Sequence, residues 1–116
     1  MKTYTGSCHC GKVKFEVTAD IKSVISCNCS ICYKRGLLLA FVKADQFKLQ
    51  TDENLQTDYR FHAMKIHHLF CKDCGVEAYG KGNGPDGSAT YAVNVRCLDD
   101  LDLETLTITP FDGKSL

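Results

Sequence analysis

The sequence predicts an all-β domain with mainly antiparallel sheets, whose loops carry cysteines. Two observations favour this class: short stretches in which apolar and polar residues alternate, and turn-forming segments between them. A third is that no long stretch repeats its apolar residues at helical spacing. With 116 residues and no linker or internal repeat, the chain is expected to form a single domain over residues 1–116. A domain of this size has a modest core and benefits from a bound metal.

The first expected strands follow from apolar patterning. Residues 12–18 alternate, with Val13, Phe15 and Val17 on one face, which predicts a half-buried strand. Residues 37–42 are a continuous apolar run, short enough for a buried strand. Both strands are expected to contribute to one core.

Further strands are expected in the second half of the chain. Residues 47–50 and 55–61 predict a hairpin around the sequence TDEN, because apolar and polar residues alternate in the second of them. Residues 64–70, 89–95 and 107–111 are also expected to be extended, whereas residues 99–106 predict one or two helical turns. The segment 80–88, GKGNGPDGS, contains four glycines and a proline and predicts a loop.

The charge balance and the apolar content exclude some classes of partner. The 14 basic residues equal the 14 acidic ones, so nothing favours nucleic acid as a partner. The N-terminus has no apolar run of signal-peptide length, and no stretch of about 18 apolar residues occurs, so no membrane association is expected. We therefore expect a cytoplasmic protein. In that reducing compartment, eight cysteines indicate metal binding or thiol chemistry more than disulfides.

Four of the cysteines form two pairs that predict a closed zinc site. Cys71 and Cys74 are separated by two residues and followed by Gly75, the pattern of a zinc knuckle. Cys8 and Cys10 would lie about 7 Å apart on a flat strand, so the backbone must bend for both sulfurs to reach one ion. Four thiolates at about 2.3 Å from zinc would form a structural site. Disulfides or buried thiols are the alternative interpretation.

Three more cysteines, in the sequence CNCSIC, predict a second zinc site with an incomplete ligand set. Cys27, Cys29 and Cys32 supply three thiols, and three protein ligands with one replaceable ligand are typical of catalytic zinc. Alternatively, Cys97 or a histidine completes the site, or an iron–sulfur cluster replaces one zinc. Cys97 is otherwise expected to be a small apolar residue at the end of a strand. A zinc ion with three thiolates suits thiol binding better than water activation.

The sequences GSCHCGKVKFEV, CNCSICYKRGLLLAFV, FCKDCGV and VNVRCLDDLDL…FDGK together resemble the glutathione-dependent formaldehyde-activating enzyme family, also called the centromere-protein-V/GFA domain. The similarity runs from Gly6 to Lys114. The resemblance implies an Mss4-like fold with a pair of antiparallel sheets and two Zn²⁺ ions. It assigns a structural zinc to the first four cysteines and the zinc associated with activity to the remaining three; these residues are Cys8, Cys10, Cys71 and Cys74, and Cys27, Cys29 and Cys32.

The resemblance also implies a reaction, in which glutathione and formaldehyde combine to S-(hydroxymethyl)glutathione, classed as a carbon–sulfur lyase in reverse. The expected partners are thus a small-molecule thiol and an aldehyde. Candidates for proton transfer are His67, His68, Tyr33 and Arg35, while Lys34 and Arg35 are candidates for binding a carboxylate; solvated surface residues are the alternative for all of them. In a strand, one of the two adjacent histidines should point inward and the other outward.

Two other functions use the same residues. The first is a non-catalytic zinc-binding module that binds another protein, and the second is a metal or redox buffer with loosely held zinc. Loosely held zinc would indicate the buffer. A protein that turns over no thiol–aldehyde pair would favour the interaction module over an enzyme.

Overall fold

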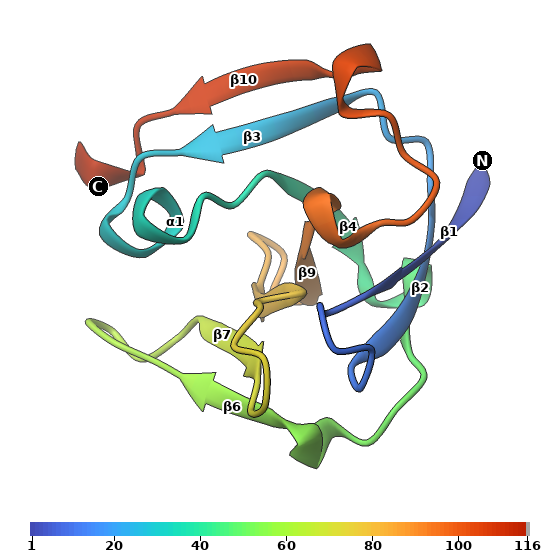
Figure 1. The fold of residues 1–116 in the computed structure, drawn as a ribbon. Helices are drawn as coiled ribbons and strands as arrows, with labels where there is room; N and C mark the ends of the chain where they lie inside the picture. Colours follow the sequence, from blue (N-terminus) through green and yellow to red (C-terminus); the bar gives the residue numbers. More distant parts are fainter. Residues whose placement is uncertain (116) are drawn as a thin grey trace.

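Two β-sheets and one short helix make up the computed structural model, which describes residues 1–115 (Figure 1). The strands are β1 (Lys2–Ser7), β2 (Lys14–Ala19), β3 (Ser23–Cys27), β4 (Leu39–Lys43), β5 (Phe47–Leu49), β6 (Gln56–Tyr59), β7 (His67–Cys71), β8 (Tyr79–Asn83), β9 (Ala89–Asn94) and β10 (Thr107–Phe111). The helix is α1 (Ser30–Arg35), and short 3-10 turns are η1 (Ala44–Gln46), η2 (Glu53–Leu55), η3 (Val95–Cys97), η4 (Leu103–Thr105) and η5 (Gly113–Ser115).

The smaller sheet has the strand order β1-β2-β5, and the larger has the order β10-β3-β4-β9-β8-β7-β6. Neighbouring strands are antiparallel except β10 and β3, which run parallel, with Thr107 opposite Ser23 and Phe111 opposite Cys27. Figure 1 shows these two strands side by side, although they are far apart in the chain. The predicted all-β class with mainly antiparallel sheets is confirmed.

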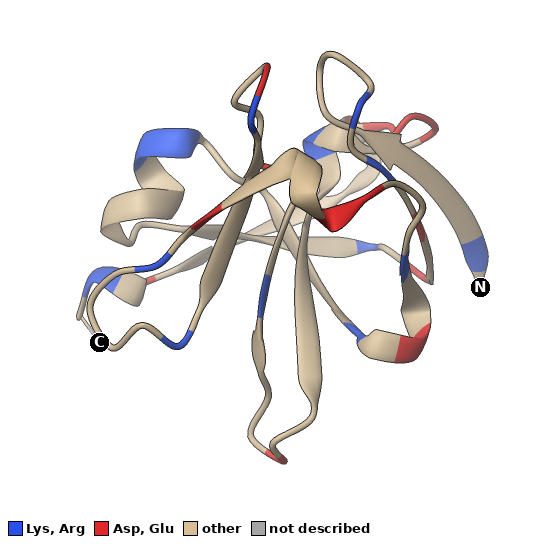
Figure 2. Ribbon diagram, turned by 90° about the horizontal axis from the view of Figure 1, so that it is seen from below, with Lys and Arg blue, Asp and Glu red and all other residues tan. Residues whose placement is uncertain are grey.

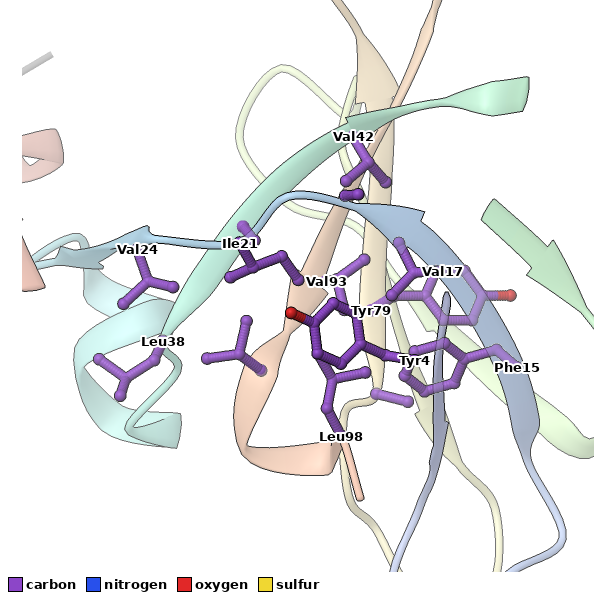
Figure 3. Close-up of a cluster of buried hydrophobic side chains, with 14 of the residues drawn as sticks. Tyr4, Phe15, Val17, Ile21, Val24, Leu38, Val42, Tyr79, Val93 and Leu98 are labelled. Carbon is purple, nitrogen blue, oxygen red and sulfur yellow. The ribbon is translucent and has the colours of Figure 1, made fainter. Parts of the chain in front are cut away.

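The core lies where the two sheets face each other. Val13, Phe15 and Val17 are fully buried, as the alternation in residues 12–18 predicts. Aromatic rings connect the sheets: Phe47 of β5 stacks on Tyr91 of β9, with ring centroids 4.4 Å apart. Figure 3 shows side chains of both sheets, including Phe15, Tyr79 and Val93, gathered in this core.

The predicted hairpin between residues 47–50 and 55–61 is wrong. Strand β5 pairs with β2 in the smaller sheet, whereas β6 pairs with β7 in the larger one. The chain passes between the sheets through η2, so the two segments never meet as a pair. The one aromatic residue of β6, Tyr59, is exposed, whereas the polar Gln56 is buried.

The predicted loop at 80–88 is partly wrong, because β8 extends to Asn83 and pairs with β7 and β9. Within this strand, Gly80 allows a close approach of chains: a Cβ there would lie 3.2 Å from the carbonyl oxygen of His67. The turn itself is confined to the following residues, where the Gly87 N–H donates to the Gly84 carbonyl at 2.9 Å. Glycine thus marks both a tight contact and a turn in one segment.

Helix α1, β1 and β3 were not expected from the sequence. The helix spans six residues and ends at Gly36, which has the left-handed φ of 65° that favours glycine. Its N-cap is Cys29, whose sulfur accepts a hydrogen bond from the Cys32 N–H. The single 3-10 turn η4 and strand β10 agree with the expectations for residues 99–106 and 107–111.

Charged residues are distributed over the whole fold. Figure 2 shows basic and acidic segments interspersed along the ribbon, consistent with a formal net charge of zero. Within residues 1–115, no helix has the length and apolarity to cross a membrane.

Candidate metal centres

Cys8, Cys10, Cys71 and Cys74 meet at one point, which we call the four-cysteine group. The first two lie in the turn after β1, and the other two at the end of β7 and in the turn that follows. All four sulfurs lie within 4.8 Å of one another, and Cys10 Sγ is 3.6 Å from both Cys8 Sγ and Cys71 Sγ. Sulfurs on a tetrahedral zinc with bonds of about 2.3 Å lie about 3.8 Å apart, so the group fits such an ion.

The backbone forms both halves of this group as the spacing predicts. Between Cys8 and Cys10 the chain turns, with the Gly11 N–H donating to the Cys8 carbonyl at 3.3 Å. In the second half, Gly75 has a φ of 80° and its N–H donates to the Cys71 carbonyl at 2.9 Å. The expected bend at the first pair and the expected positive φ after the second are both present.

Backbone N–H groups point to sulfurs of this group and help to lower the pKa of two of them, Cys71 and Cys74. At Cys10 a backbone N–H also acts to lower the pKa, but burial and the neighbouring thiols raise it to about 11. The Val13 N–H points to Cys8 Sγ at 3.3 Å. Desolvation acts to raise the pKa of Cys74, but the N–H groups of Cys10 and Val76 and the neighbouring thiols lower this pKa to about 6. Thiolates are the form that binds metal, so these donors act as the outer shell of a metal site.

Cys27, Cys29 and Cys32 form the three-cysteine group, whose sulfurs also lie within 4.8 Å of one another. Cys27 ends β3, Cys29 caps α1 and Cys32 lies inside the helix. The Cys29 N–H donates to Cys27 Sγ, and the Cys32 N–H donates to Cys29 Sγ, both at 3.4 Å. The helix cap and the group thus share residues. The Cys29 sulfur caps the helix, and the helix places the Cys32 sulfur near those of Cys27 and Cys29.

The thiols of this group differ in acidity. Burial raises the pKa of Cys32, and the neighbouring Cys29 raises it further. Burial also acts to raise the pKa of Cys29, but the Cys32 N–H and the two neighbouring thiols lower it below its ordinary value. The Cys29 thiolate is thus stabilised by hydrogen bonds from Cys27 and Cys32. Binding of a cation to all three sulfurs would release the protons of the other two thiols.

Among residues 1–115, no further histidine, cysteine, aspartate or glutamate joins the three sulfurs within 4.8 Å. Cys97 lies elsewhere, in η3 after β9, where it packs against the main core. Burial raises the pKa of this thiol to about 11, and its sulfur lies 3.7 Å from Asn94 Nδ2. Cys97 is therefore outside both groups.

A surface hollow of about 280 Å³ borders the three-cysteine group. Its lining comes from one side of α1 and from the end of β6 with the residues after it, namely Ser30, Ile31, Lys34, Arg35, Tyr59 and Phe61. Ser30 and Ile31 are the two residues between Cys29 and Cys32, and Ile31 packs against the group. The hollow therefore lies next to the residues that carry the group, although no cysteine is part of its lining.

Arg35 in this lining is already bound by the protein. Its guanidinium forms an ion pair with Glu77, whose side chain is almost fully buried, and lies 5.0 Å from the centre of the Phe70 ring. The pair connects the helix that carries Cys32 to the segment between β7 and β8. Glu77 belongs to none of the sequence motifs, so this contact was not foreseen.

The two histidines point in opposite directions, as their adjacency on a strand predicts. His68 is 8% exposed and stacks on Phe61, with centroids 5.3 Å apart. His67 is half-buried on the other face, where its Nδ1 lies 2.7 Å from Asp58 Oδ2. Tyr33 is 76% exposed and does not line the hollow. Of the four proton-transfer candidates, Arg35 alone lines the hollow. His68 contacts the hollow only through Phe61, on which it stacks.

Replacing Arg35 by methionine is expected to destabilise the protein by about 3 kcal/mol, because the buried carboxylate of Glu77 would lose its guanidinium partner and keep only His68, whose Nδ1 lies 3.9 Å away. The measurement is urea-induced unfolding followed by circular dichroism. The double variant Arg35→Met, Glu77→Met is the control, and it should recover much of the loss. Equal stability of the single variant and the wild type would contradict the structural role of the pair.

A small β fold that gathers seven cysteines into a group of four and a group of three defines a metal-binding protein class with two candidate centres. The chain belongs to the glutathione-dependent formaldehyde-activating enzyme family, whose sequence model matches residues 3–110. The family's Mss4-like fold agrees with the observed sheets.

A similar solved structure is the crystal structure of a Rhodobacter sphaeroides protein from a structural genomics programme. It has a TM-score of 0.77 and 26% sequence identity to this chain, and the match covers 90% of this chain and 99% of that one. The likeness therefore extends over most of the fold.

Proposed function

We propose that the protein is a zinc-dependent enzyme that adds a low-molecular-weight thiol, such as glutathione, to a small aldehyde, such as formaldehyde. The reaction is of the S-(hydroxymethyl)glutathione synthase type, a carbon–sulfur lyase in reverse. The observation that carries the proposal is the three-cysteine group beside an open hollow, with no fourth ligand from residues 1–115. Family membership supports the same reaction.

The two cysteine groups have different roles in this proposal. The four-cysteine group has a complete tetrahedral ligand set and holds a structural zinc. The three-cysteine group holds a second zinc with one replaceable position. When bound there, a zinc ion lowers the pKa of a thiol that reaches it.

The reaction needs no redox partner. The sulfur of the thiol forms a bond to the aldehyde carbon, the carbon–oxygen double bond becomes single, and the thiol proton is transferred to the oxygen. The protein's contribution is to place the two reactants side by side in the hollow.

The lining of the hollow suits an anionic thiol. Lys34 offers the ammonium group, because Arg35 is engaged by Glu77 and Phe70. Tyr59 and Phe61 stack on each other with centroids 5.7 Å apart and form the opposite wall. A peptide thiol would have its carboxylate near Lys34 and its backbone against the rings.

Reversing the charge of Lys34 tests this arrangement. Lys34→Glu is expected to raise KM for glutathione about tenfold, because a carboxylate would repel the substrate's carboxylate. KM for 2-mercaptoethanol, which has no carboxylate, should not change. The control is Lys14→Glu, at an exposed position of β2 away from the hollow. Equal effects on both thiols would contradict a carboxylate contact at Lys34.

The proposed function is tested by NMR on the zinc-loaded protein with a panel of aldehydes and thiols. We expect protein-dependent acceleration of hemithioacetal formation and breakdown, seen as exchange between free aldehyde and adduct, for glutathione with formaldehyde. The acceleration should increase only as the second equivalent of zinc is added to the protein. A fully metallated protein that accelerates no thiol–aldehyde pair would refute the proposal and favour a zinc-binding interaction module.

A further inference from the structure

The carboxyl-terminal turn η5 lies directly on the three-cysteine group. A Cβ at Gly113 would lie 2.5 Å from Cys27 Sγ and 3.2 Å from Cys29 Cβ. The first distance is far shorter than van der Waals contact, so a side chain does not fit at this position. Gly113 has no positive φ, which means that the need for glycine arises from this contact and not from the backbone conformation.

Asn28, the residue between Cys27 and Cys29, holds this turn in place with three hydrogen bonds. Its backbone N–H donates to the Phe111 carbonyl at 3.1 Å. Its side-chain Nδ2 donates to Asp112 Oδ1, and its Oδ1 accepts from the Lys114 N–H, both at 2.9 Å. An amide side chain supplies a donor and an acceptor together, which this pair of contacts requires.

Burial of apolar surface does not explain why the turn lies there. Strand β10 delivers the turn to Cys27 through its parallel pairing with β3, yet all five residues of β10 are exposed, including Ile108 and Phe111. The segment is therefore held by backbone pairing and by Asn28.

We propose that the carboxyl-terminal turn is a wall of the three-cysteine centre, and that Gly113 and Asn28 are positioning residues that hold Cys27 in place for a metal ion. The inference rests on the part of the proposed function that assigns a metal to this group. The turn covers the group at Cys27 and Cys29, whereas the hollow borders it at Ser30 and Ile31. The two features thus flank the group at different residues.

Titration of the Co²⁺-loaded protein with a chelator tests the proposal, because thiolate–cobalt absorption falls as each centre loses its ion. The spectrum of a Cys29→Ser variant defines the four-cysteine signal. Gly113→Ala is expected to weaken Co²⁺ binding at the three-cysteine centre by about tenfold or more and to leave the four-cysteine centre unchanged. The matched control is Gly82→Ala, where an added Cβ meets Ile66 at an ordinary 3.7 Å. Equal affinities of the Gly113→Ala and Gly82→Ala variants would overturn the proposal.

A second pair of variants tests the role of Asn28. Asn28→Asp should weaken the three-cysteine centre, because two carboxylates would face each other where the amide now donates to Asp112. Adding Asp112→Asn returns a donor to this contact and should restore the affinity. Failure of this rescue would overturn the role of Asn28. Since metal affinity is the readout, a wild type without thiol–aldehyde activity would refute the proposed function and leave these affinity ratios unaffected.

Discussion

Replacing Cys71 by serine is expected to abolish the cooperative thermal unfolding of the protein. Cys71 is almost fully buried, and it connects the end of β7 to the turn after β1 through the four-cysteine group. Binding of structural zinc contributes about 10–16 kcal/mol in small zinc domains, as much as the whole stability of a typical domain, about 5–15 kcal/mol. Without this ion, the protein would therefore lose most of the free energy that stabilises its folded state.

Circular dichroism during heating, with zinc content measured on the same sample, checks this result. Cys97→Ser is the control, because Cys97 lies outside both groups and its loss should change neither the zinc content nor the transition greatly. Wild type treated with a strong chelator should resemble Cys71→Ser. If Cys71→Ser unfolds at the wild-type temperature, the four-cysteine group is not what stabilises the fold.

Replacing Cys29 by serine is expected to leave the fold intact and to remove one zinc and the activity together. Cys29 caps a six-residue helix at the surface and takes no part in the main core. A serine hydroxyl can still cap the helix, but it is a far weaker ligand for zinc. Turnover should fall by more than about 100-fold, the upper end of what loss of an outer-shell partner costs a metal site.

Zinc content, circular dichroism and the NMR assay on one preparation test this second prediction. We expect one zinc in place of two, an unchanged far-ultraviolet spectrum and loss of turnover. The same Cys97→Ser control should keep two zincs and full activity. Full turnover by a Cys29→Ser protein that has lost one zinc would rule out the three-cysteine centre as the site of the reaction.

Much of the fold could be predicted where one strand face is buried and the other is not. Residues 12–18 illustrate this, because Val13, Phe15 and Val17 all lie in the core. The same alternation in residues 55–61 does not mark a core face, since Tyr59 and Phe61 line the hollow beside α1. Period-two patterning predicts a two-faced strand, but it does not tell which strand is its neighbour.

The missed elements have local causes. Helix α1 is too short to show an apolar period, and its N-cap is a cysteine rather than a residue typical of caps. The glycines of β8 resemble a turn in the sequence, although Gly80 serves a close contact between neighbouring chain segments.

The candidate metal ligands could be grouped from spacing, because ligands close in the chain must turn toward one ion. The structure brings the same seven cysteines together in the same two groups. Glu77, Gly113 and the hollow could not be predicted, since each depends on contacts between distant segments. Gly113, for example, meets Cys27 only because β10 pairs in parallel with β3.

The central claim is that two metal centres with unequal ligand sets occur in one chain. Anomalous diffraction at the zinc edge, from crystals of the zinc-loaded protein, tests it most directly. We predict two zinc peaks per chain, one bonded to Cys8, Cys10, Cys71 and Cys74, the other to Cys27, Cys29 and Cys32 with a fourth ligand that is not a protein group. A single peak, or a second zinc whose fourth ligand comes from the protein, would contradict the claim.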